Sequence, residues 1–187
     1  MRKPVIGVMG GSKASPSVAA RARRLGELIA RRGWILLTGG RNVGVMAASA
    51  RGAKEAGGFV VGVLPDRSDH KACPHLNVVI CTDMGDARNV VNVLSSDVVI
   101  VCPGRMGTLS EVALALNADK RVILLGFELC DPPFRKHIES GQLTTAATPE
   151  DALIQAADAL EGRAPLSIGG AITRGRSKGI RLPGPAT

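Results

Sequence analysis

Aromatic residues are nearly absent from this 187-residue chain, which has one Trp, three Phe and no Tyr, 2% of the total. Hydrophobic residues nevertheless make up 45%, so the core must be built from Val, Leu, Ile and Ala. Together with the 23 glycines, this composition favours an α/β layer fold with close helix–sheet packing over a sandwich or barrel. The length suits one domain with a sizeable core.

Paired cysteines and long apolar runs are also missing. The four cysteines form no CxxC pair and no spacing typical of zinc ligands, so we expect reduced thiols and no metal site. No apolar run approaches the ~20 residues that cross a membrane, and the first apolar run is too short for a signal peptide. We therefore predict a soluble, cytoplasmic protein with no membrane partner.

The net charge of +8 is concentrated near the end of the chain. Five of the 24 basic residues follow Glu161, and none of the 16 acidic residues does. That segment is rich in glycine and proline and has no periodicity, which predicts a folded domain over residues 1–161 and a basic, flexible tail over residues 162–187. Because the domain has few aromatic side chains on which bases could stack, a nucleic-acid partner is not expected.

Short apolar runs alternate with amphipathic segments along the first 161 residues. The apolar runs predict strands at 5–9, 34–37, 59–64, 76–81, 98–102 and 121–125, with a further short strand at 144–145. The strands at 98–102 and 121–125 are expected to be buried. Apolar residues at helical spacing predict helices at 16–32, about 47–56, 85–95, 107–118 and 148–161. Strands that alternate with helices pair in parallel through right-handed crossovers. The predicted fold is therefore a single doubly wound, Rossmann-like parallel sheet with helices on both faces.

Three glycine-containing turns follow predicted strands, so they lie at the carboxyl edge of the sheet, where doubly wound folds bind ligands. They are Gly10-Gly11-Ser12-Lys13, Gly39-Gly40-Arg41-Asn42-Val43-Gly44-Val45-Met46 and Pro103-Gly104-Arg105-Met106-Gly107-Thr108. The third turn opens a helix, whose first backbone N–H groups attract anions. We predict a phosphate or sugar-phosphate site, with Gly107 and Thr108 as its main contacts. The absence of GxxxxGK(S/T) and GxGxxG argues against a P-loop NTPase and a standard NAD dehydrogenase.

Two charged residues flank this predicted pocket. Glu111 lies one turn inside the helix that follows the third turn, and Arg88 lies near the start of the preceding helix. Thr108 and Glu111 also have the spacing of a capping box, in which both side chains bond backbone N–H groups at a helix start. A cap and a role in binding therefore both stay open for Glu111, and a surface salt bridge is the alternative for Arg88. The segment from Thr148 to Asp151 has similar spacing without a glycine turn.

The pattern Pro103-Gly104-x-x-Gly107-Thr108-x-x-Glu111 resembles the PGGxGTxxE signature of the LOG (LONELY GUY) proteins, of the lysine-decarboxylase-like Rossmann superfamily. The second turn resembles their GGGxxGLM motif and the first turn their first loop. Arg88 falls where that family has an arginine. Within the superfamily the chain is most similar to the molybdenum cofactor carrier branch.

The resemblance implies one of two functions. The one we favour is a binding or carrier protein for a phosphorylated, nucleotide-like or pterin-like small molecule, with molybdopterin cofactor or a nucleotide monophosphate as ligand. The alternative is a LOG-type phosphoribohydrolase that cleaves the N-glycosidic bond of a nucleoside 5′-monophosphate. In that case Glu111 and Arg88 are catalytic, and no cofactor is required for the chemistry. The resemblance also implies a homodimer or larger homo-oligomer.

The chain departs from the LOG pattern in both motifs. Arg41 and Arg105 replace the third glycine, and Ser110 replaces one carboxylate of the family's glutamate pair. Because arginine can hold phosphate bidentately, the added guanidinium groups favour an anionic ligand, whereas the lost carboxylate weakens the case for hydrolysis. The predicted binding residues are Gly11, Ser12, Lys13, Gly39, Gly40, Arg41, Gly44, Val45, Met46, Arg88, Pro103, Gly104, Arg105, Met106, Gly107, Thr108 and Glu111.

Overall fold

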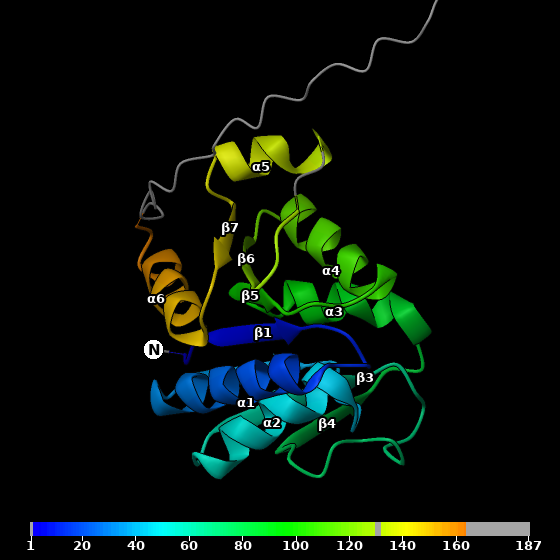
Figure 1. The fold of residues 1–187 in the computed structure, drawn as a ribbon. Coiled ribbons are helices and arrows are strands. Elements are labelled where there is room, and N and C mark those ends of the chain that lie inside the picture. The colour runs from blue at the N-terminus through cyan, green and yellow to red at the C-terminus, as the bar shows by residue number, and fades with distance from the viewer. Residues whose placement is uncertain (1, 130–131, 164–187) are drawn as a thin grey trace, which may run out of the picture.

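The computed structural model of the protein describes residues 2–129 and 132–163 (Figure 1). A seven-stranded parallel sheet has the strand order β4-β3-β2-β1-β5-β6-β7. The strands are β1 (Val5–Met9), β2 (Ile35–Thr38), β3 (Phe59–Leu64), β4 (Val78–Cys81), β5 (Val98–Val101), β6 (Arg121–Leu125) and β7 (Leu143–Ala146). The helices are α1 (Pro16–Arg31), α2 (Gly44–Glu55), α3 (Arg88–Leu94), α4 (Met106–Asn117), α5 (Arg135–Glu139) and α6 (Pro149–Leu160), with short 3-10 turns η1 (Gly85–Ala87) and η2 (Pro132–Phe134). The predicted doubly wound sheet is confirmed.

Each face of the sheet has its own apolar core, because alternate side chains of a strand point to opposite faces. On β5, Val98 and Ile100 belong to the core under α1, α2 and α6, whereas Val99 and Val101 belong to the core under α3 and α4 (Figure 1). All four are at most 1% exposed. A strand covered on both faces is a continuous apolar run in the sequence, which explains why these strands could be predicted.

Helices α1 and α2 approach each other closely at two glycines. A Cβ atom at Gly26 would lie 2.0 Å from the Ser49 carbonyl oxygen, and one at Gly52 would lie 1.9 Å from the Arg23 carbonyl oxygen. Any larger residue would force the two helices apart. This contact fixes the position of α2 against α1, and with it the position of the glycine turn that precedes α2.

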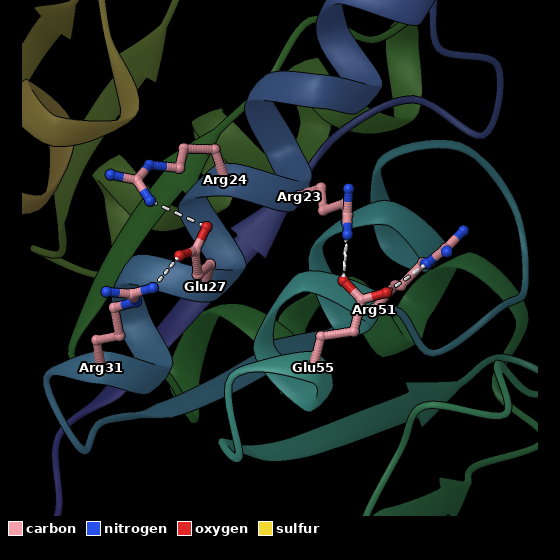
Figure 2. A network of polar contacts seen from close by, with 6 residues as sticks. All are labelled: Arg23, Arg24, Glu27, Arg31, Arg51 and Glu55. Atoms are coloured by element: carbon pink, nitrogen blue, oxygen red, sulfur yellow. Dashed lines mark hydrogen bonds and ion pairs between the residues drawn. The ribbon is translucent and has the colours of Figure 1, made fainter.

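Ion pairs cover the outer surface of α1 and α2 (Figure 2). Each of two carboxylates bridges two arginines: Glu27 pairs with Arg24 and Arg31, and Glu55 pairs with Arg23 and Arg51. The side chains of all six residues are between 28% and 68% exposed, so each pair contributes little to stability. The four arginines therefore lie on a solvated surface, where each is paired with a carboxylate.

The structure differs from the sequence prediction mainly between β6 and β7. No element was expected at residues 132–139, which form η2 and α5; this segment begins with two prolines and is too short to show a helical period. The strand predicted at 144–145 is confirmed, and it extends over 143–146. The predicted tail lies outside the described residues beyond Arg163. Among the described helices, none combines the length and apolarity needed to cross a membrane.

Candidate functional site

The three glycine turns meet where the sheet order reverses, at the carboxyl ends of β1, β2 and β5. The Gly11 N–H donates a 3.1 Å hydrogen bond to the Pro103 carbonyl, and the Val45 N–H donates a 3.1 Å hydrogen bond to the Gly11 carbonyl. The first turn is therefore held between the other two. These backbone bonds join segments far apart in the sequence into one rigid edge.

Glycine is required at two points of this edge. Gly44 has a φ of +51°, and a Cβ atom there would lie 2.2 Å from the Gly11 carbonyl oxygen. A Cβ atom at Gly104 would lie 2.0 Å from the Thr108 Oγ1 atom and 2.9 Å from the Gly11 nitrogen. These two glycines allow the turns to pack against one another.

A cavity of about 250 Å³ opens beside the three turns. The predicted binding residues that line it are Gly11, Ser12, Lys13, Gly39, Arg41, Met46, Arg88, Arg105, Gly107, Thr108 and Glu111. The other predicted residues do not line it and lie in the surrounding turns: Gly40, Gly44, Val45, Pro103, Gly104 and Met106. The turns thus bring most of the predicted residues together, and the others form the frame of the cavity.

The cavity also has lining residues outside the predicted binding set, of which Gly10 and Val43 belong to the predicted first and second turns. They are Val8, Met9, Gly10, Val43, Asp86 and Asn89. Val8 and Met9 end β1, so the carboxyl-edge rule could have found them. Asp86 and Asn89 lie within two residues of Arg88, at the start of α3. Over residues 2–129 and 132–163, no group of three His, Cys, Asp or Glu side chains is arranged to hold a metal ion.

Helix α4 presents free backbone N–H groups to this cavity. The helix begins at Met106, with Arg105 at the cap position and no hydrogen bond from a capping side chain. The Leu109 N–H donates to the Arg105 carbonyl at 3.0 Å, so the N–H groups of Met106, Gly107 and Thr108 precede the hydrogen-bond ladder of the helix. Such an uncapped helix start binds anions through its N–H groups and its dipole.

The capping-box interpretation of Thr108 and Glu111 is wrong. Thr108 lies inside α4 rather than at its cap, because the cap position is held by Arg105, three residues before Thr108. The similar segment at α6 is capped: the Thr148 Oγ1 atom accepts a 3.1 Å hydrogen bond from the Asp151 N–H. Glu111 is therefore available for a role in the cavity.

Arg88 and Glu111 form a buried charge pair at the cavity. Their side chains are 11% and 9% exposed, and the Arg88 Nη1 atom lies 3.6 Å from the Glu111 Oε1 atom. This distance is too long for a hydrogen bond, and the Arg88 Nε and Nη1 atoms are buried without a hydrogen-bond partner. The guanidinium packs against Gly39, where a Cβ atom would lie 2.8 Å from Nη2. Buried donors without partners are costly, so Arg88 is suited to bind an acceptor on a ligand.

Burial changes the protonation of this pair. It raises the pKa of the Glu111 carboxyl from 4.5 to about 7, and the nearby charge of Arg88 opposes the rise. Burial also lowers the pKa of Arg88, against the opposing effect of the Glu111 charge, but an arginine stays protonated in proteins. A carboxyl that titrates near neutral pH in a cavity is a candidate proton donor or acceptor.

Arg41 does not point freely into the cavity. Its Nε and Nη2 atoms donate hydrogen bonds of 2.9 and 2.8 Å to the two carboxylate oxygens of Asp66, which hold the pKa of Asp66 below its usual value. The Asn42 N–H donates a 3.0 Å bond to the Lys71 carbonyl. The arginine that replaces glycine in the second turn therefore ties this turn to the loop after β3 while it lines the cavity.

Residues 3–153 match the model of the SLOG cluster4 family. This chain belongs to the SLOG cluster4 family. Among solved structures, this SLOG protein is similar to the molybdenum cofactor binding protein of Rippkaea orientalis, with 47% identity and a TM-score of 0.80 over 86% of this chain and 99% of that one. The molybdenum cofactor carrier protein of Chlamydomonas reinhardtii is 41% identical, with a TM-score of 0.78 and the same coverage.

A second kind of relative of this SLOG protein is named as an enzyme. The cytokinin riboside 5′-monophosphate phosphoribohydrolase of Mycobacterium tuberculosis is 39% identical over 97 residues, which are 49% of this chain and 50% of that protein. The chain therefore matches about half of the length of this relative. The resemblance to the LOG-like Rossmann superfamily, and within that superfamily to the molybdenum cofactor carrier branch, is confirmed.

Proposed function

We propose that this protein binds and carries a phosphorylated, nucleotide-like or pterin-like small molecule, with the molybdenum cofactor as the leading candidate. The observation that carries the proposal is a cavity with two sets of unused donors, the first N–H groups of α4 and the buried guanidinium of Arg88. The likeness to two molybdenum cofactor proteins over 86% of the chain supports this choice of ligand.

The two sets of donors suit different parts of such a ligand. A phosphate at the start of α4 accepts hydrogen bonds from the N–H groups of Gly107 and Thr108, and the exposed cations Lys13 and Arg105 at the cavity wall add favourable charge. An ionised Glu111 repels phosphate. The phosphate therefore lies at the helix end, and the rest of the ligand faces Glu111 and Arg88, where Arg88 can hold a second polar or anionic group.

Thermal unfolding with added ligand tests the proposal. Molybdopterin, or a nucleoside 5′-monophosphate, raises the melting temperature by mass action, and the corresponding compound without phosphate gives a smaller rise. Arg105→Met weakens binding by about tenfold, the typical worth of a charged hydrogen bond. Arg67→Met is the matched control, because Arg67 pairs with Asp83 on the exposed surface and does not line the cavity. If no phosphorylated compound shifts the melting temperature, the proposal fails.

A phosphoribohydrolase activity is the second candidate, favoured by the burial of Glu111. A carboxyl with a pKa near 7 beside an arginine can activate water or stabilise the positive charge that builds on ribose as the N-glycosidic bond breaks. Water then replaces the base at C1′, and the base leaves with a proton. Incubation with purine monophosphates tests this: release of free base and ribose 5-phosphate, abolished by Glu111→Gln, would establish the enzyme. Ser110, which replaces the second carboxylate, is exposed and does not line the cavity.

We further propose that the protein is a homodimer or larger homo-oligomer that pairs through the edge of the sheet at β4. Val78, Val79 and Ile80 of this edge strand are 39%, 39% and 42% exposed. The strand has no charge or proline that would block pairing with another strand. Light scattering after size-exclusion chromatography should give a particle mass of more than one chain. Ile80→Lys, which places a charge on the edge strand, should lower that particle mass. A monomeric wild-type protein contradicts the proposed homo-oligomer.

The cytoplasmic location stays a prediction.

A further inference from the structure

The charge balance at Arg88 depends on a single carboxylate in close contact. Glu111 lies 3.6 Å from the guanidinium, and both side chains are at most 11% exposed. Two of the guanidinium nitrogen atoms, Nε and Nη1, are buried without a hydrogen-bond partner among the described residues. The pair is thus close enough for strong electrostatic coupling, but no hydrogen bond locks it. Arg88 lines the cavity, so an acceptor bound there can approach the guanidinium without first breaking a hydrogen bond to Glu111.

Few other charges face this pair. They are Asp86 from η1, Arg41 from the second turn, Asp66 from the loop after β3, and Lys13 and Arg105 from the cavity wall. Arg41 is neutralised by its two hydrogen bonds to Asp66. From α3 itself, the fully buried Asn92 brings an uncharged amide near Glu111. Arg88 is therefore the main cation that keeps the Glu111 carboxylate ionised.

We propose that an anionic group bound at Arg88 makes Glu111 take up a proton, so that ligand binding is coupled to pH. This inference rests on the proposed function, because it concerns the regulation of the same site. The bound anion accepts a hydrogen bond from the Arg88 guanidinium at the cavity wall and offsets the positive charge that favours the ionised form of the Glu111 carboxyl. It also places a like charge beside Glu111. The carboxyl then binds a proton from solvent, and its O–H becomes a hydrogen-bond donor to the ligand.

The direction of the effect follows from the free protein. Above about pH 7, Glu111 is ionised before the ligand binds, so binding must draw a proton from solution. Affinity then falls by up to about tenfold for each unit of pH. At lower pH the carboxyl is already protonated, and the affinity no longer depends on this group. A carrier built in this way holds its anionic ligand more tightly in acidic than in alkaline surroundings.

The first test needs no ligand. Arg88→Met removes the positive charge beside Glu111, which imitates its neutralisation by a bound anion. A ¹³C-carboxyl NMR titration then measures the protonation of Glu111 as a function of pH. The titration midpoint of Glu111 moves to higher pH in Arg88→Met and stays in place in the matched surface variant Arg67→Met. The titration starts at acidic pH, where Glu111 is neutral, so that the variant does not contain a buried carboxylate without a partner, which would destabilise its fold. Arg88→Gln replaces Arg88→Met if the latter does not fold. An unchanged or lower midpoint overturns the coupling.

The second test uses inorganic sulfate, which does not titrate near neutral pH. Calorimetry at about pH 8, in two buffers with different ionisation enthalpies, measures proton uptake on binding. The wild-type protein takes up a fraction that approaches one proton per sulfate, and Glu111→Gln binds sulfate without uptake. Binding without uptake in the wild type, uptake that persists in Glu111→Gln, or no sulfate binding at all would each overturn the inference. If sulfate binds with the stated proton uptake but no phosphorylated compound binds, the proposed ligand class fails and the coupling between Arg88 and Glu111 stands.

Discussion

Replacing Glu111 by Gln removes a buried titration and should make the protein more stable at alkaline pH. Burial raises the carboxyl pKa from 4.5 to about 7, so the folded state holds this proton more tightly than the unfolded state. The associated stability is fully present below about pH 4.5 and is lost as the pH rises through about 7. The shift corresponds to about 3 kcal/mol. Glutamine mimics the neutral carboxyl, so Glu111→Gln keeps this stability at high pH.

Urea unfolding at a series of pH values, from about 4.5 to about 8.5, measures the effect. The two free energies of unfolding should agree at the acidic end and diverge until the variant is about 3 kcal/mol more stable. Glu150→Gln is the control, because hydrogen bonding to Arg24 on the surface lowers the pKa of Glu150. That variant should not gain stability at alkaline pH. Parallel curves for wild type and Glu111→Gln would refute the assignment of Glu111 as a buried, proton-holding carboxyl.

Four further substitutions test the α1–α2 contact, the start of α4 and the α6 cap. Gly52→Ala should destabilise the protein by about 1–3 kcal/mol, because the new Cβ atom would lie 1.9 Å from the Arg23 carbonyl oxygen; an unchanged urea midpoint would contradict the close α1–α2 contact. Gly107→Ala should leave stability unchanged or higher, since nothing lies within 4 Å of the new Cβ atom, and should weaken the binding of a nucleoside 5′-monophosphate in calorimetry. Thr148→Ala should lower the free energy of unfolding by about 1 kcal/mol through loss of the α6 cap, whereas Thr108→Ala removes no cap. Equal losses of stability in urea unfolding would support a capping role for Thr108.

Much of the fold was accessible from local patterns. A strand such as β5, covered on both faces, is a continuous apolar run, and the glycine turns mark the ends of β1, β2 and β5. The short helix α5 was missed because five residues cannot display a helical period. The start of α4 was misplaced because Thr108 and Glu111 match a capping pattern whose actual cap position holds Arg105.

The candidate site was predictable in outline but not in its charge pairing. The glycine turns and the carboxyl-edge rule placed Gly107, Thr108 and Glu111 at one cavity. That Arg41 bonds Asp66, 25 residues away, depends on how the loop after β3 folds back, which no local pattern encodes. The burial that raises the pKa of Glu111 is likewise a property of the assembled layers rather than of the sequence around it.

The central claim is that the cavity binds a phosphorylated small molecule at the start of α4, where the cap residue Arg105 adds favourable charge. The most direct measurement is the melting temperature of the protein as molybdopterin is added under anaerobic conditions, with the wild type and Arg105→Met side by side. At a ligand concentration of about 100 times the dissociation constant, the wild type should gain about 2.7 kcal/mol, a rise of several degrees. Arg105→Met should need about tenfold more ligand for the same rise. No rise in the wild type, or equal rises in both proteins, would contradict the account.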